Sequence, residues 1–411
     1  MKKIIYFAAL AFTFICNLSL AQDRNVVWVH GMEGSNQSWK QNYQHYTGAK
    51  KITNVVVAYN SANGAIDAAN QVRTQINSQL GTGNTNPTNM AIGHSMGGLT
   101  IRQMEKDDKQ NNVNRIGGFI TVGTPHTGAQ IANAEQQGLI KPFLQNGVND
   151  LLAGPAAITL GVPVIANFVS TKLSDWIGAM LYSEFKSFGQ GGAIDDLKVG
   201  NPTLATLNAY NCTKPRIALA GNEDAPALWK QIGSIALNSP SNIPRNQVKD
   251  NAVADMASKA TGIYDGFYWT YRVLSWVPKV KFMNNYYVNC ANAWLRGKVW
   301  IERANGVWFG MAGAVQSSTM VSYPFLSNSC ALGFCIGKVQ SQSFQINTPA
   351  PFDGIVRASS ATALPGALYT KVVQGANHQE CVNHPGINGE LDAIIGNLKT
   401  NGNPFFYTAP R

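Results

Sequence analysis

Charged residues are scarce in this chain, since they make up 13% of its 411 residues against 45% hydrophobic residues. A chain this long and apolar can bury one large core or two smaller ones, which excludes an intrinsically disordered protein. Acidic residues are scarcer than basic ones, 22 against 32, and the formal net charge is +10. The basic residues stand singly, without a basic block or a nucleic-acid-binding motif. This pattern predicts a solvated surface with no nucleic-acid partner and, at most, weak attraction to anionic interfaces.

Cysteine is also sparse, with six in the whole chain. No pair has the C-x-x-C spacing of a structural zinc site, so zinc binding by cysteines is not expected. Cys330 and Cys335 are close enough in sequence to close a small disulfide loop. The other cysteines after residue 21 are Cys212, Cys290 and Cys381. They allow three alternative pairings, which the sequence does not rank, and each pairing leaves one cysteine unpaired.

Residues 1–21 are typical of a secretory signal peptide. Lys2 and Lys3 precede an apolar run from Ile4 to Cys16, and Ser19-Leu20-Ala21 forms a cleavage pattern. We expect cleavage near Ala21 and secretion of a soluble mature chain to the periplasm or the extracellular space. Disulfides can form in these compartments.

Strand-like and helix-like stretches alternate through the first half of the chain. The patterns predict strands over 25–29, 53–59, 90–92 and 116–122, and helices over 65–80 and 96–106. Such alternation favours an α/β fold with a mostly parallel central sheet and helices on both faces. In folds of this kind the active site lies beyond the carboxyl ends of the strands.

The segment Gly93-His94-Ser95-Met96-Gly97 stands where a buried strand is expected to meet a helix. A G-x-S-x-G pattern at that place is typical of a nucleophile elbow, a turn so tight that glycine is needed on both sides of the serine. Ser95 is therefore the candidate nucleophile. The alternative is an ordinary turn, because a serine before two glycines also occurs without catalysis.

A second glycine-containing turn, His30-Gly31-Met32, follows the first predicted strand directly. The backbone amide of Met32 could point at the same spot as that of Met96, and two convergent donors make an oxyanion hole. The alternative is a plain strand-to-loop turn.

An acid and a histidine follow the serine in the chain, in the order that elbow enzymes use. Asp353 starts a loop in Phe352-Asp353-Gly354, and His378 ends a strand-like run. In a triad His378 would take the serine proton, and Asp353 would orient the imidazole and stabilise its charged form.

Other residues compete for these roles. Asp224 and Glu223 follow the predicted strand at 216–220 and are rival acids, although chain order favours Asp353. His384 precedes a proline and suits a helix start better than catalysis. His126 stands in a Gly/Pro-rich turn at the wrong place in the chain order, and we expect a structural role for it at the floor of the site.

Taken together, these motifs resemble the bacterial secreted true lipases of the α/β-hydrolase fold. The resemblance covers about residues 25–135, 200–224 and 351–400, and lipid-remodelling deacylases of eukaryotes share part of it. It implies that Ser95 is the nucleophile, Asp353 the acid and His378 the base, and that the amides of Met32 and Met96 are the oxyanion donors.

The resemblance also raises the question of calcium. Many of these lipases bind calcium through an acidic residue two positions after the histidine, and Glu380 stands there. A second carboxylate has no clear match, so no cofactor is expected, and calcium remains an alternative. The disulfide that these enzymes place near the acid has no counterpart, because Ser359 stands where a cysteine would be expected.

Two insertions interrupt what we expect to be a single α/β-hydrolase domain over residues 22–411. The first, about 130–200, contains an uncharged apolar stretch at 151–166, in which Pro155 and Pro163 argue against a membrane-spanning helix. The resemblance implies a mobile apolar lid here, and a buried helical pair is the alternative.

The second insertion, about 225–350, is rich in aromatic residues. We expect strands around a turn at Arg303-Ala304-Asn305-Gly306 and a helix over 247–258. Aromatic residues most often build a core. A cap over the acyl pocket, or a surface that adheres to lipid or polymer, is the alternative.

These observations predict a secreted serine carboxylic-ester hydrolase, a lipase that cleaves long-chain acyl esters through an acyl-enzyme intermediate. Its partner would be a lipid or other acyl ester, at a lipid–water interface. An esterase, phospholipase or polyester hydrolase is the enzymatic alternative, and a non-catalytic binding protein of the same fold is the alternative from another class. The sequence leaves open the acyl chain length, the oligomeric state, hydrolysis against acyl transfer, and the need for a folding chaperone.

Overall fold

The computed structural model describes residues 24–32, 34–50, 52–81, 86–147, 149–150, 192–223, 227–236, 243–245, 247, 252–396, 399, 403–408 and 410. The predicted signal peptide with its cleavage site at Ala21, the apolar stretch 151–166 and the rival acid Asp224 lie outside these residues.

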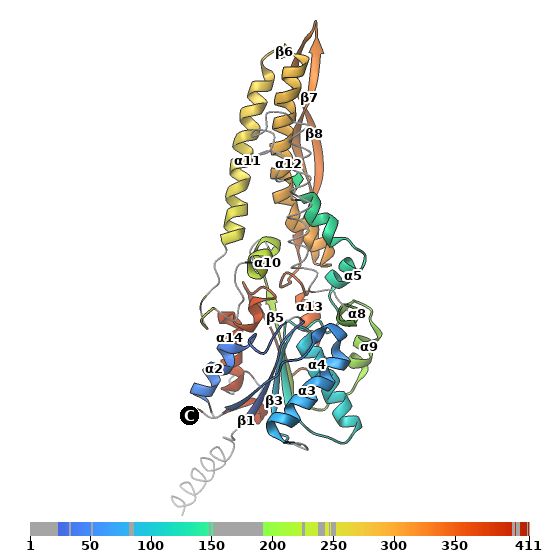
Figure 1. Ribbon diagram of the computed structural model, residues 1–411, viewed down its shortest axis with the longest axis vertical. Helices are drawn as coiled ribbons and strands as arrows, with labels where there is room; N and C mark the ends of the chain where they lie inside the picture. Colours follow the sequence, from blue (N-terminus) through green and yellow to red (C-terminus); the bar gives the residue numbers. More distant parts are fainter. Residues whose placement is uncertain are drawn as a thin grey trace, which may run out of the picture.

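A six-stranded parallel sheet forms the centre of the molecule (Figure 1). Its order is β2-β1-β3-β4-β5-β9, and every neighbouring pair is parallel. The strands are β1 (Arg24–Val29), β2 (Ile52–Val56), β3 (Met90–His94), β4 (Gly118–Val122), β5 (Arg216–Asn222) and β9 (Tyr369–Gln374). The inner strands β3 and β4 are buried along their whole length, as expected when helices cover both faces. The predicted α/β-hydrolase fold is confirmed.

Helices pack on both faces of this sheet because alternate strand residues point to opposite sides. Val27 and Val29 of β1 face a core shared with α3 (Ala65–Leu80) and α4 (Met96–Gln110). Val26 and Trp28 face the other core, which includes side chains of α2 (Lys40–Ala49) and α14 (Pro385–Ile395). The two faces therefore hold two separate hydrophobic cores.

Shorter elements surround the sheet. They are η1 (Ser61–Asn63), α5 (Gln130–Gln136), α8 (Gly192–Leu197), α9 (Pro202–Ala209), α10 (Ala227–Ala236), α13 (Ala358–Ala361), η4 (Glu380–Val382) and η5 (Pro404–Phe406). We refer to the described residues of 24–247 and 351–408 as the body.

Residues 252–349 form an elongated arm that projects from the body (Figure 1). Its elements are α11 (Ala252–Trp276), β6 (Lys279–Val280), α12 (Lys281–Met311), β7 (Val315–Ala331) and β8 (Phe334–Pro349). The two helices pack against a long β7–β8 hairpin, and β6 pairs with the turn end of β8. No helix among the described residues combines the length and the apolar character needed to cross a membrane.

The strands expected around Arg303–Gly306 are absent from that place, and this expectation is wrong. All four residues lie inside α12. Gly306 permits close packing, since a Cβ atom there would lie 2.9 Å from the backbone nitrogen of Asn347 on β8. The Asn347 side-chain amide donates to the Gly306 carbonyl at 2.8 Å. The helix expected over 247–258 is found from Ala252 and continues to Trp276.

Cys330 and Cys335 are joined by a disulfide next to the hairpin turn, as the sequence suggested. The expectation that one cysteine stays unpaired is wrong, because Cys212, Cys290 and Cys381 are all free. These three side chains pack in three different hydrophobic clusters, which keeps their sulfur atoms apart.

Candidate active site

Ser95 lies on the tight turn between β3 and α4, with φ 52° and ψ −127°. This left-handed conformation is unfavourable for a residue with a side chain. The flanking glycines make the turn possible. A Cβ atom at Gly93 would come within 2.7 Å of the Gly97 backbone, and one at Gly97 within 2.3 Å of the His30 carbonyl oxygen. The geometry is that of a nucleophile elbow.

The three predicted triad side chains form a continuous hydrogen-bonded chain. His378 Nε2 lies 2.9 Å from Ser95 Oγ, and His378 Nδ1 lies 2.7 Å from Asp353 Oδ2. All three residues are buried. A carboxylate only accepts, so Nδ1 carries the ring proton and Nε2 is left to accept the serine proton. The structure thus brings together residues that are 283 and 25 positions apart in sequence.

The turn at Asp353 holds its carboxylate in place. Asp353 Oδ1 accepts the backbone N–H groups of Ile355 at 3.0 Å and Val356 at 2.7 Å, and the backbone N–H of His378 donates to the Asp353 carbonyl at 2.7 Å. The indole N–H of Trp308 donates to the Gly354 carbonyl at 2.7 Å. Trp308 belongs to α12, so the base of the arm is hydrogen-bonded directly to the turn that carries Asp353.

His94 contacts the backbone of His378, and this contact was not predicted from the sequence. Its Nε2–H donates to the His378 backbone carbonyl at 2.8 Å. Burial lowers the pKa of His94 well below its ordinary 6.5, and the neighbouring His378 ring lowers it further. The ring is therefore neutral near pH 7. The only sequence signal is its position directly before Ser95.

The residues that carry the two predicted oxyanion donors both lie beside Ser95. Met96 is the first residue of α4, and backbone N–H groups in the first turn of a helix lack intrahelical partners and can donate to an anion. Met32 lines the same pocket as Ser95 and His378. The Gly31–Met32 segment lies directly against Ser95, because a Cβ atom at Gly31 would be 2.9 Å from Ser95 Cβ.

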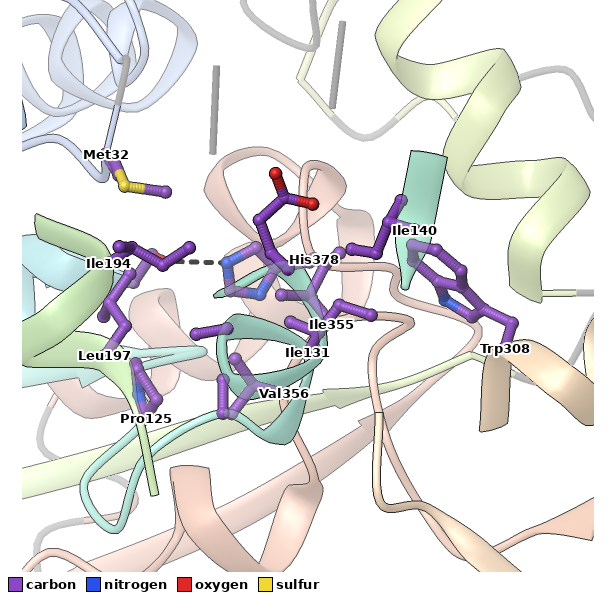
Figure 2. Close-up of a pocket in the computed structure, with 14 residues that line it drawn as sticks. Met32, Pro125, Ile131, Ile140, Ile194, Leu197, Trp308, Ile355, Val356 and His378 are labelled. Carbon is purple, nitrogen blue, oxygen red and sulfur yellow. Dashed lines mark hydrogen bonds between the residues drawn. The ribbon is translucent and has the colours of Figure 1, made fainter. Parts of the chain in front are cut away.

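A mainly apolar pocket of about 530 Å³, including its solvent-open part, adjoins Ser95. Figure 2 shows His378 in the middle of the pocket, with Met32 and Trp308 at opposite ends of the view. Glu135 is the carboxylate among the lining residues. The apolar lining consists of Met32, Pro125, Ala129, Ile131, Ala132, Ile140, Ile194, Leu197, Trp308, Ile355 and Val356. Such a surface favours an aliphatic or aromatic group.

The rival histidines have other partners. His384 caps the N-terminus of α14 by accepting the Gly386 N–H at 3.1 Å, which confirms the predicted helix-start role. His126 accepts from Arg102 at Nδ1 and donates from Nε2 to Thr121 Oγ1, each at 3.0 Å. These bonds confirm a structural role, although His126 is not among the residues that line the pocket beside Ser95. Burial lowers its pKa well below 6.5, and Arg102 adds to the shift.

The surroundings of Glu380 do not fit a calcium site. The Lys230 ammonium lies between two buried carboxylates, 3.0 Å from Glu223 Oε2 and 3.6 Å from Glu380 Oε2, and donates to the Gly375 carbonyl at 2.9 Å. Calcium needs six to eight oxygen ligands, whereas here an ammonium already faces the carboxylates. In the part of the chain that the structure describes, no three His, Cys, Asp or Glu residues form a group that could hold a metal ion.

Comparison with known proteins gives matches among solved structures alone, since no family model and no curated protein matches this chain. The lipase BlEst2 of Bacillus licheniformis is 12% identical with a TM-score of 0.39, and the match covers 91% of each chain. Phospholipase PlaB of Legionella pneumophila is 16% identical with a TM-score of 0.31, over 53% of this chain and 44% of its own.

A third similar structure is an extracellular α/β-hydrolase from a Paenibacillus species. It is 14% identical with a TM-score of 0.26, over 47% of this chain and 76% of its own. The function of the present chain is therefore inferred from the residues of its own site.

Proposed function

We propose that this protein is a serine carboxylic-ester hydrolase, a lipase that cleaves long-chain acyl esters through an acyl-enzyme on Ser95. The observation that carries the proposal is the buried Ser95–His378–Asp353 hydrogen-bonded chain at the edge of an apolar pocket. This arrangement matches the roles of nucleophile, base and orienting acid in geometry as well as in chain order.

In the first half-reaction Ser95 Oγ attacks the ester carbonyl carbon while His378 Nε2 takes the hydroxyl proton. The Asp353 carboxylate stabilises the resulting imidazolium, and the amides of Met32 and Met96 donate to the oxyanion. When the tetrahedral intermediate collapses, the bond to the alcohol oxygen breaks. His378 returns its proton to that oxygen, and the acyl group stays on Ser95.

In the second half-reaction water attacks the acyl-enzyme as His378 accepts one of its protons. Collapse of this intermediate restores the Ser95 hydroxyl, which regains the proton from His378, and releases the carboxylic acid. An alcohol could take the place of water, which would make the reaction an acyl transfer.

The pocket supports an acyl chain as the group beside the nucleophile. Its lining offers apolar contact over most of its surface, and burial of each methylene contributes about 0.8 kcal/mol. We therefore favour long acyl chains over acetyl groups. An esterase, a phospholipase or a polyester hydrolase would use the same residues with a different acyl or alcohol group.

We propose that the reaction uses no bound metal. The Lys230 ammonium supplies the positive charge beside Glu380 that calcium would otherwise supply. Treatment of the protein with EDTA should leave its ester hydrolysis rate unchanged within twofold. A large loss of rate that added calcium restores would overturn this part of the proposal.

We also propose that the protein is secreted after removal of residues 1–21, on the basis of their basic and apolar pattern. Mass spectrometry of the exported protein should find Gln22 at its N-terminus.

Hydrolysis of p-nitrophenyl esters of increasing acyl length tests the activity, with and without an emulsified interface. We expect rates that rise with chain length and at the interface, and that vanish in Ser95→Ala. Equal rates on acetyl and long-chain esters without an interfacial gain would replace the lipase with an esterase. No activity on any ester would favour the non-catalytic binding protein.

A further inference from the structure

The far end of the arm exposes apolar side chains. Leu332 at the hairpin turn is 99% exposed, and Phe282 at the start of α12 is 75% exposed. We define the apolar tip as six exposed residues from the hairpin turn, β6 and the adjoining helix ends. They are Trp276, Val277, Val280, Phe282, Leu332 and Phe334. Val280 pairs with Phe334, so β6 and the hairpin turn are one structural unit (Figure 1).

The hairpin turn presents Leu332 at a cost to folding. Leu332 and Gly333 form a two-residue loop between the paired residues Ala331 and Phe334, and their φ angles are 51° and 80°. Positive φ at both positions is the pattern of a type I′ turn, for which Asn-Gly is strongly preferred. A leucine at the first position is strained and, when fully exposed, gains no burial in return. The stability of the fold therefore does not explain why a leucine stands at position 332.

The turn is also held rigid. Ala331 and Phe334 close the loop, and the next pair along the hairpin, Cys330 and Cys335, is joined by a disulfide. On the outer edge of β8, Lys279 of β6 pairs with Cys335. A rigid apolar projection loses little conformational entropy when it inserts into another phase, which favours binding.

The charges around the apolar tip are all positive. Arg272, Lys279, Lys281 and Lys338 lie in the segments that form this end of the arm. Residues 266–301 and 315–349 contain no aspartate or glutamate. A second copy of the same tip would bring these like charges together, which opposes self-association. Anionic headgroups would complement them.

We propose that the apolar tip binds the surface of an anionic phospholipid bilayer. Leu332, Phe334 and Phe282 enter the boundary between headgroups and acyl chains, and the lysines pair with the phosphates. From its first residue at the tip, the 31-residue helix α12 runs back to the body over roughly 45 Å. The arm thus tethers the body to lipid, and this binding does not depend on the proposed catalysis.

Vesicle sedimentation tests the proposal with the full chain carrying Ser95→Ala, so that no lipid is hydrolysed. The vesicles contain equal parts of phosphatidylcholine and phosphatidylglycerol, or phosphatidylcholine alone. We expect binding to the mixed vesicles and much weaker binding to phosphatidylcholine. Replacing Lys279, Lys281 and Lys338 with Gln should weaken the binding by about a hundredfold. The charge-matched control replaces Lys40, Lys106 and Lys371 and should retain most of the binding.

The decisive variant is Leu332→Asn. It should weaken binding about tenfold by removing an inserted leucine. The same change should leave the protein as stable to urea or more stable, because Asn is preferred at this turn. The matched control Ile66→Asn, at an exposed isoleucine of the body, should bind like the parent chain.

Three results would overturn the proposal. The first is absence of binding to mixed vesicles, and the second is binding that Leu332→Asn does not weaken. The third is a dimer in analytical ultracentrifugation that Leu332→Asn dissociates, which would make a second copy the partner.

Discussion

The body and the arm differ in how far they expose large apolar side chains. In the body, both faces of the sheet are covered, and the exposed large hydrophobic residues described there are three: Ile66, Leu139 and Val199. In the arm, exposed large hydrophobic residues extend from Ile263 to Val339. The body buries its polar groups as well, in hydrogen-bonded sets around Ser95. This contrast suggests that the body is built to hold a reactive geometry and the arm to present a surface.

The largest expected effect concerns the body alone. Asp353→Asn should lower kcat by about 10⁴-fold, because an amide at this position no longer favours the proton on Nδ1 of His378. Circular dichroism and urea denaturation should show a folded protein that still binds mixed vesicles. Joint loss of activity and vesicle binding would contradict the separation between body and arm.

A comparison of two lysines tests how deeply the body depends on buried charge. Lys230→Met should lower the free energy of unfolding by about 3–5 kcal/mol, because it leaves the buried Glu223 and Glu380 carboxylates without their cation. Lys298→Met is the matched control in the arm. Its ion pair with Asp265 is partly exposed, and its loss should cost less than about 1 kcal/mol. Urea denaturation measures both losses, and equal losses in the two variants would contradict the claim that the buried charges around Lys230 matter more.

Buried neutral histidines should make the body sensitive to mild acid. Burial lowers the pKa of His30, His94 and His126 below the ordinary 6.5. As pH falls below about 6.5, these histidines become protonated in the unfolded chain but stay neutral in the folded chain. The free energy of unfolding therefore falls. Above that pH this contribution to stability is fully present.

Urea denaturation at a series of pH values between 7.5 and 5, a range chosen on either side of the ordinary histidine pKa, measures this slope. His126→Gln removes one of these groups and should make the slope shallower. An unchanged slope in that variant would show that His126 does not contribute.

The smallest expected effect lies where body and arm meet. Trp308→Phe removes the hydrogen bond to the Gly354 carbonyl while keeping most of the apolar contact. This hydrogen bond helps to hold the turn that carries Asp353, and its loss should reduce transition-state stabilisation by about 1 kcal/mol. The value of kcat should therefore fall by roughly fivefold. Vesicle binding should not change, since the apolar tip lies at the other end of the arm. A change in KM alone would instead assign Trp308 to substrate contact.

How far the sequence predicts the structure also differs between body and arm. Helix α3 and the strands of the body follow local hydrophobic periods, and the elbow around Ser95 is a local pattern, so both could be predicted. Lys230 and Trp308 could not, because each reaches the site from a distant segment and only tertiary packing brings it there. Gly306 was misleading, since its sequence context suggests a turn whereas it allows β8 to approach α12.

The central claim is that Ser95 is the nucleophile, and covalent trapping tests it most directly. The mature protein is treated with a fluorophosphonate at neutral pH, digested and analysed by mass spectrometry. The account predicts one adduct, on the peptide that contains Ser95, and no adduct in His378→Ala. An unlabelled Ser95 in the folded protein, or an adduct on another residue, would contradict the account.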